Sequence, residues 1–238
     1  MVLLTNSWLA SADSTHSHAA AARVAASVME CPLPSAAASA VAAELVVLDR
    51  WMGDVTGLYL CLFDFPAHKK GAGLIHIYNY IATYQAAYGA DVSDVGTVGT
   101  FYAIGPNAST PMAFKDAMWE KYKLGEYLML NDPQTGKPAL RNLFYETQDG
   151  DELPRVGPIG PFPTASILAL QRDMGTVFLL CNNAVNAFSM DLSMRGLGET
   201  EAIVADLKNH IHDGVHLVPA MVIAIEKAQV AGIAYNKQ

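Results

Sequence analysis

Short apolar runs alternate with segments of helical periodicity over most of this chain of 238 residues. The runs at 58–63 and 176–181 are nearly free of polar residues and too short for buried helices. Such runs are typical of strands that are buried on both faces of a parallel sheet. Because helical patterns follow the runs, the sequence predicts an α/β domain with about five mostly parallel strands and helices on both faces.

The boundaries of the expected elements come from glycine, proline and capping residues. The expected strands are 58–63, 95–104, 176–181 and 215–218, and the expected helices are 73–88, 110–122, 163–174, 182–194, 199–211 and 220–231. Residues 131–162 are rich in proline and glycine and show no periodicity, which predicts a long loop. Such a loop is either a functional or subunit-binding segment or an ordinary surface excursion.

The domain organisation follows from an Ala-rich beginning. Residues 1–52 are expected to form a helical N-terminal extension, with helices at 17–30 and 35–52, and residues 53–238 to form the α/β domain. Residues 24–40 loosely imitate a signal peptide, but two prolines interrupt them and Arg23 is the only nearby cation. A degenerate export signal remains the alternative interpretation.

Composition excludes several classes of protein. The chain has 15 Lys and Arg against 23 Asp and Glu, a net charge of −8, which disfavours binding to nucleic acid. No apolar run is long enough to cross a membrane. Apolar residues make up 52 % of the chain and charged residues only 16 %, which favours a homo-oligomer that buries part of its surface.

The three cysteines are Cys31, Cys61 and Cys181, and they lie far apart in the sequence. Their number and spacing suit neither a disulfide framework nor a cysteine-based zinc site. Free thiols favour a reducing compartment, so we expect the cytoplasm, with export as the alternative.

Cys181 is the leading candidate for chemistry. It ends a predicted strand and directly precedes a predicted helix, where backbone N–H groups and the helix dipole favour a thiolate. Such a thiolate could carry sulfur as a persulfide or act as a nucleophile, with Asn182 and Asn183 as ligand-binding neighbours. The alternative is a buried cysteine that behaves as a small apolar residue, as we expect of Cys61 in the middle of its strand.

Two further groups are weaker candidates. His68 and Lys69, with Lys70, form a compact basic loop at a strand end, which either holds the anionic group of a small ligand or is a solvated loop. His210, His212 and His216 lie within seven residues and could bind a transition metal or haem, or simply lie at a helix end and in a turn. No dinucleotide-binding, phosphate-loop, nucleophile-elbow or zinc-protease motif is present, and no cofactor is firmly implied.

The C-terminal third resembles the DsrE-like family of small sulfur-metabolism proteins. The stretches that carry the resemblance are VFLLCNN (177–183), ADLK (205–208), GVHLVPA (214–220) and AQVAG (228–232). The segments 116–126, 131–133 and 141–142 look like a longer branch whose members often start with a twin-arginine signal, which this chain lacks. A histidine that commonly follows the second strand in that branch is replaced here by Tyr102 and its neighbours. The match covers roughly residues 50–238.

The resemblance implies a flavodoxin-like parallel sheet, homo-oligomers and a persulfide-carrying cysteine, which maps onto Cys181. We therefore expect a homo-oligomer that handles sulfur or another small redox ligand, exchanging it with a small molecule or a sulfur-carrier protein. One alternative is a non-enzymatic assembly subunit, with the extension and the loop 131–162 at its contacts. The other is the metal or haem site at His210, His212 and His216.

Overall fold

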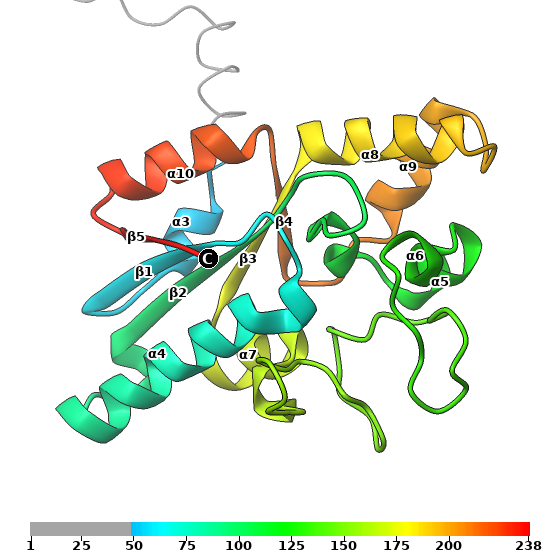
Figure 1. The fold of residues 1–238 in the computed structure, drawn as a ribbon. Helices are drawn as coiled ribbons and strands as arrows, with labels where there is room; N and C mark the ends of the chain where they lie inside the picture. Colours follow the sequence, from blue (N-terminus) through cyan, green and yellow to red (C-terminus); the bar gives the residue numbers. More distant parts are fainter. Residues whose placement is uncertain (1–48) are drawn as a thin grey trace, which may run out of the picture. The chain divides into compact units, whose positions relative to one another are not determined.

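A computed structural model describes residues 49–238 of the chain (Figure 1). At its centre is a five-stranded sheet in which all neighbouring strands are parallel, in the order β4-β3-β2-β1-β5. The strands are β1 (Tyr59–Asp64), β2 (Val95–Phe101), β3 (Val177–Cys181), β4 (Val215–Val218) and β5 (Ala234–Lys237). The expectation of an α/β, flavodoxin-like arrangement with about five parallel strands is confirmed.

Helices connect the strands in the predicted alternation. The α-helices are α3 (Trp51–Asp54), α4 (Ala72–Tyr88), α5 (Asp116–Lys121), α6 (Leu124–Tyr127), α7 (Ile167–Met174), α8 (Asn182–Met194), α9 (Thr200–Asn209) and α10 (Met221–Val230). The 3₁₀ helices are η1 (Lys69–Gly71), η2 (Val92–Asp94), η3 (Thr110–Ala113) and η4 (Pro163–Ala165). Left-handed glycines, Gly89 and Gly175, end α4 and α7, as the sequence pattern indicates.

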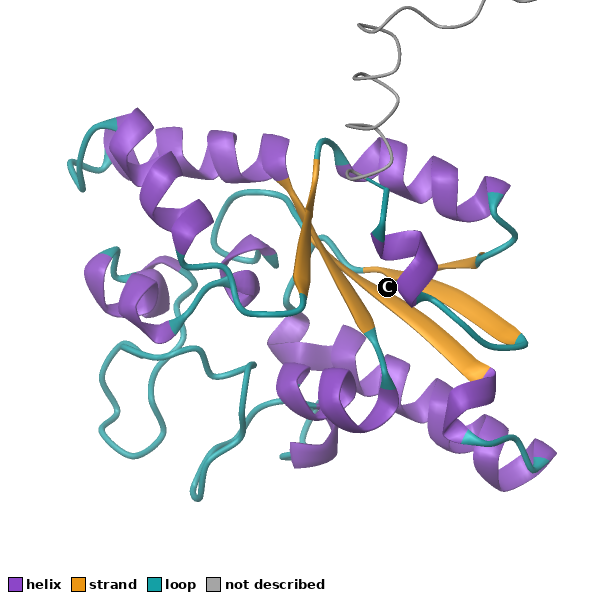
Figure 2. Ribbon diagram, turned by 180° about the vertical axis from the view of Figure 1, so that it is seen from behind, coloured by secondary structure: helices purple, strands orange, loops and turns teal. Residues whose placement is uncertain are grey.

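A separate apolar core lies on each face of the sheet. Leu74 of α4, Leu170 of α7 and Phe188 of α8 belong to one core, which also contains side chains of α9. Trp51 of α3 and Ala224 of α10 belong to the other. Figures 1 and 2 show α10 on one side of the sheet and α4 and α7 on the other. Right-handed crossovers explain this division, because β1 to β4 advance in one direction across the sheet whereas β5 returns to the far edge.

Burial on both faces holds for the central strands only. Every residue of β2 and β3 is buried, but all four residues of β5 are exposed and β4 is half-buried. These two strands form the edges of the sheet, so each has a neighbour on one side only. The expectation that the predicted strands are buried on both faces is therefore wrong for β4, and β5 was not among the predicted strands.

The helix expected at 110–122 is interrupted. Phe114 and Lys115 are extended and separate η3 from α5. Phe114 forms an antiparallel bridge with Ile211, and the N–H of Lys115 donates to the carbonyl of His210 (2.9 Å). Pairing with a segment about 100 residues away therefore overrides the local helical pattern.

Residues 131–162 contain no helix or strand, as expected. The loop is nevertheless ordered by its own contacts: Asn131 bridges Pro138, and Val156 bridges Ile159. Arg141, with its side chain 16 % exposed, pairs with both Asp132 and Asp151. It is an ordered excursion with an internal ionic cluster.

The predicted helices at 17–30 and at 35–52 up to residue 48 lie outside the described residues, as does Cys31. Within the described part, Trp51 and Val55 are buried against the face that α10 covers. Among residues 49–238, no helix combines the length and apolar character that crossing a membrane requires.

Candidate functional site at the topological switch point

The connections that leave β3 and β4 go to opposite faces of the sheet. β3 ends at Cys181 and β4 at Val218, and these two residues are partners in the parallel register. Helix α8 begins directly after Cys181, and α10 begins at Met221, after two intervening residues; the two helices start close together and run in opposite directions (Figure 1). In open parallel sheets, ligands bind outside the carboxyl ends of the strands where neighbouring connections diverge in this way. The structure therefore places Cys181 at the topological switch point.

The thiol of Cys181 lies between the beginnings of two helices. Cys181 is the residue that precedes α8, and its Sγ accepts a hydrogen bond from the backbone N–H of Met221, the first residue of α10 (3.3 Å). Both helix dipoles place partial positive charge at these ends, which favours an anionic sulfur. The residue is only 6 % exposed, so its chemistry is confined to small reagents or requires local opening.

A buried carboxylate lies at the carboxyl end of β1. The Asp64 cluster consists of Asp64, Thr100, Tyr102 and Tyr235. The carboxylate accepts hydrogen bonds from the hydroxyls of Tyr102 (2.7 Å) and Tyr235 (2.6 Å), with Thr100 at 3.4 Å. Among the described residues, no Lys, Arg or His forms an ion pair with it. The protein therefore stabilises this charge with neutral hydroxyl groups.

The Asp64 cluster and Cys181 share one face of the sheet. Tyr102 packs against the core that contains Cys181. Burial is the largest cause that raises the pKa of Tyr102, followed by its hydrogen bond to Asp64, with a smaller effect from Cys181. The hydrogen bond to Asp64 is the main cause that raises the pKa of Tyr235 to about 12. Both phenols consequently stay protonated and donate at neutral pH.

Sequence reasoning did not find this cluster. Tyr102 falls inside the strand expected at 95–104, but β2 ends at Phe101. The N–H of Tyr102 donates to the hydroxyl of Ser109 (3.0 Å) instead of continuing the ladder. In the sequence, Asp64 is simply the polar residue that follows the apolar run at 58–63. No local pattern links Tyr235 to it, because β5 reaches Asp64 through a long-range pairing.

The predicted ligand-binding neighbours of Cys181 have different environments. Asn182 is the first residue of α8, and its Oδ1 is buried without a hydrogen-bond partner among the described residues. Asn183, one residue further along the helix, is exposed. The residue that directly follows Cys181 therefore carries a buried amide oxygen without a hydrogen-bond partner among the described residues.

His68 and Lys69 do not act as a pair. His68 is buried, its Nδ1 accepts from the N–H of Lys70 (3.1 Å), and its Nε2 donates to the carbonyl of Pro106 (3.3 Å). Burial lowers its pKa, so the ring is neutral. Lys69 is exposed. His68 therefore positions the loop after β1.

The three clustered histidines have separate partners. His210 Nδ1 donates to the carbonyl of Asp206 (2.7 Å), and His216 lies 3.4 Å from the carboxylate of Asp54. His212 is buried, with its ring stacked on Tyr145 at a centroid distance of 3.4 Å. Within the described part of the chain, no group of three or more His, Cys, Asp or Glu side chains is placed to hold a metal ion.

Cys61 is a core residue, as predicted: it is buried within β1, and burial raises its pKa to about 11. Fold and site together define a doubly wound parallel α/β protein with a cysteine at its topological switch point. Comparison of the chain with known protein families, with curated proteins and with solved structures finds no match.

Proposed function

We propose that this chain is a sulfur-handling protein in which Cys181 accepts and releases sulfane sulfur. The observation that carries the proposal is the hydrogen bond from the Met221 N–H at the start of α10 to the Cys181 sulfur. Two helix beginnings at one sulfur favour the thiolate and equally favour a persulfide anion, which is more acidic than a thiol. The DsrE-like resemblance of the C-terminal third supports the same residue.

The transfer step is a displacement at sulfur. The Cys181 thiolate attacks the outer sulfur of a donor persulfide, R–S–SH, and the bond between the two donor sulfurs breaks. The donor leaves as the thiolate R–S⁻, and Cys181 becomes Cys–S–SH. No electrons are gained or lost overall, so the reaction needs no redox cofactor. Release to an acceptor thiolate is the same displacement in reverse.

Mass spectrometry after persulfide treatment tests this proposal. Full-length protein is treated with cysteine persulfide, alkylated with iodoacetamide and digested. We expect the peptide that contains Cys181 to carry one additional sulfur atom and the peptide that contains Cys61 to carry none. The Cys61 thiol lies inside β1, and its raised pKa keeps it protonated.

Matched serine variants give the controls. In a Cys31→Ser background, Cys61→Ser should leave the sulfur loading unchanged, and Cys181→Ser should abolish it. Loading that survives Cys181→Ser, or the absence of any additional sulfur on Cys181 in the native chain, would reject the proposal.

A second candidate function is that of a non-enzymatic assembly subunit. The outward face of α10 favours it, because Val222 and Val230 are 75 % and 83 % exposed and Ile223 lies beside them. Apolar side chains grouped in this way are typical of protein contacts. In this alternative, copies of the chain associate through α10, and the sheet is a scaffold.

Sedimentation velocity tests the second candidate. We expect a dimer or larger assembly for the native chain, and dissociation towards the monomer for Val222→Glu. Tyr88→Glu, at the exposed end of α4, is the matched control and should leave the assembly intact. A native chain that sediments as a monomer would rule out this function.

A further inference from the structure

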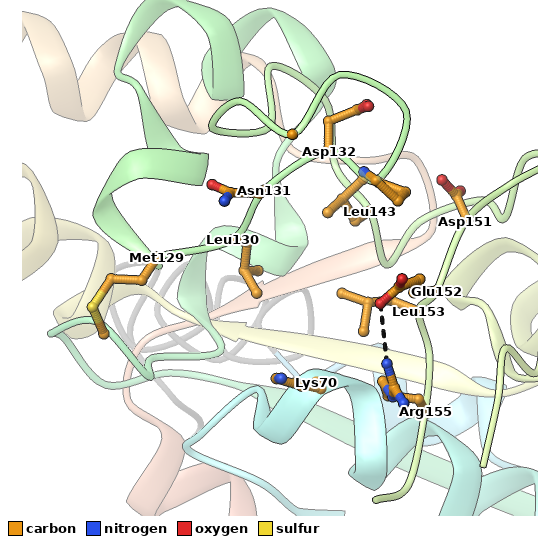
Figure 3. Close-up of a pocket in the computed structure, with 12 residues that line it drawn as sticks. Lys70, Met129, Leu130, Asn131, Asp132, Leu143, Asp151, Glu152, Leu153 and Arg155 are labelled. Atoms are coloured by element: carbon orange, nitrogen blue, oxygen red, sulfur yellow. Dashed lines mark hydrogen bonds and ion pairs between the residues drawn. The ribbon is translucent and has the colours of Figure 1, made fainter. Parts of the chain in front are cut away.

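A cavity of about 280 Å³ lies between the loop after β1 and the long loop 131–162. Figure 3 shows Lys70 on one side of it and Asp132 and Leu143 on the opposite side. Leu130, Leu143 and Leu153 supply apolar walls, and Glu152 and Arg155 form an ion pair at the rim (3.0 Å). We call this space the Lys70 cavity. Its lining comes from the basic loop and from the proline-rich loop 131–162, neither of which takes part in the proposed chemistry of Cys181.

The backbone of Lys70 is fixed at both ends of the residue. Its N–H donates to Nδ1 of His68 (3.1 Å), and its carbonyl accepts from the N–H of Arg155 (3.0 Å). These bonds hold Lys70 in a left-handed conformation, with φ of 55°. Met129, which also lines the cavity, has φ of 54°. Non-glycine residues in this region are strained and cluster at functional sites.

The two loops pack closely behind Lys70. A Cβ on Gly71 would lie 2.6 Å from the Cβ of Pro154, so only glycine permits this approach. The cavity wall therefore depends on a contact that brings Lys70 and Arg155 together. The backbone of Lys70 is thus in place before any ligand arrives, while its side chain is exposed.

The acidic side chains around the cavity already have partners. Asp132 accepts from the N–H groups of Gln134 (2.9 Å) and Thr135 (3.0 Å). Asp151 accepts from the N–H of Gln148 (2.7 Å) and pairs with Arg141. The exposed ammonium of Lys70, by contrast, has no hydrogen-bond or ion-pair partner among residues 49–238. Lys70 is thus the one charged side chain of the cavity lining without an ion-pair partner among residues 49–238.

We propose that the Lys70 cavity binds a small organic monoanion, a carboxylate attached to a short apolar chain. The carboxylate would pair with the Lys70 ammonium, and the chain would lie against Leu130, Leu143 and Leu153. The nearby carboxylates repel additional negative charge, which selects a monoanion over a phosphate or a dicarboxylate. The cavity shares no lining residue with the Cys181 site, so this inference stands independently of sulfur transfer.

Calorimetric titration of the full-length chain with hexanoate tests the proposal. We expect a dissociation constant at or below about 1 mM, which is consistent with a ligand of this size. Hexanamide has the same shape without the charge and should bind at least about tenfold more weakly. Lys70→Gln should weaken hexanoate binding by a similar factor, and Lys69→Gln, at the neighbouring lysine that does not line the cavity, should leave it unchanged.

Three results would overturn the proposal: no heat of binding with hexanoate up to about 10 mM, hexanamide binding as tight as hexanoate, or undiminished hexanoate binding by Lys70→Gln. The comparison of hexanoate with hexanamide uses the native chain, so it does not depend on the folding of a variant. Persulfide loading of Cys181 is measured separately, and its outcome leaves this test unaffected.

Discussion

Replacing Arg141 with leucine is expected to lower the free energy of unfolding by about 3–5 kcal/mol, because it leaves a buried carboxylate without its counter-charge. The side chain of Asp151 is only 1 % exposed, and Arg141 forms its ion pair. Arg141 also lies 3.7 Å from the carboxylate of Asp132, so one guanidinium serves two acids of the loop. Urea unfolding followed by circular dichroism measures the change.

An exposed ion pair provides the matched control. Arg172 and Asp173 have side chains 66 % and 49 % exposed, so Arg172→Leu should leave the free energy of unfolding nearly unchanged. Adding Asp151→Asn to Arg141→Leu removes the unpaired charge and should restore part of the lost stability. A loss below about 1 kcal/mol for Arg141→Leu alone would contradict the expectation.

Acid should destabilise the protein through His212 as the pH falls below 6.5. Burial lowers the pKa of this imidazole from 6.5 to about 4; the nearby Lys115 lowers it further, and Asp116 and Asp213 have smaller opposing effects. The ring is neutral in the folded chain, whereas the unfolded chain takes up a proton below pH 6.5. The stabilisation is therefore complete above pH 6.5 and is lost as the pH falls from 6.5 to about 4. It amounts to about 3 kcal/mol.

His212→Phe isolates this contribution, because phenylalanine preserves the stacking on Tyr145 and cannot be protonated. We expect the stability of the native chain to fall by up to about 3 kcal/mol more than that of His212→Phe between pH 6.5 and 4. His68 and His216 also have lowered pKa values, but they are present in both proteins and cancel in the difference. Parallel curves for the native chain and His212→Phe would contradict this assignment.

Much of the fold was predictable because its signals are local. The apolar runs identify β1 and β3, and helical periodicity with a following glycine identifies α4 and α7. The helix predicted at 110–122 failed because Phe114 pairs with Ile211, a contact that no local window contains. Burial was overestimated for β4 because an apolar pattern does not reveal which strands lie at the edges.

Of the candidate site, the sequence predicted the position of one residue, Cys181. Cys181 stands at a strand end in any alternating α/β pattern, so its position needed no tertiary information. Asp64 ends β1, Tyr102 directly follows β2 and Tyr235 lies within β5, and only the pairing of these strands brings the three residues together. Lys70 was visible as part of a basic loop, but its hydrogen bond from Arg155 crosses 85 residues of chain.

The sequence by itself determined that this protein is a parallel α/β domain and that a cysteine ends one of its buried strands. Periodicity and strand length are properties of neighbouring residues, and they require nothing else. The tertiary structure decided that β3 lies beside β4, so that Cys181 occupies the switch point between α8 and α10. It also decided that Lys70 faces the long loop across a cavity. Strand order and loop docking depend on which distant surfaces bury each other, and that energy is not encoded in any single segment.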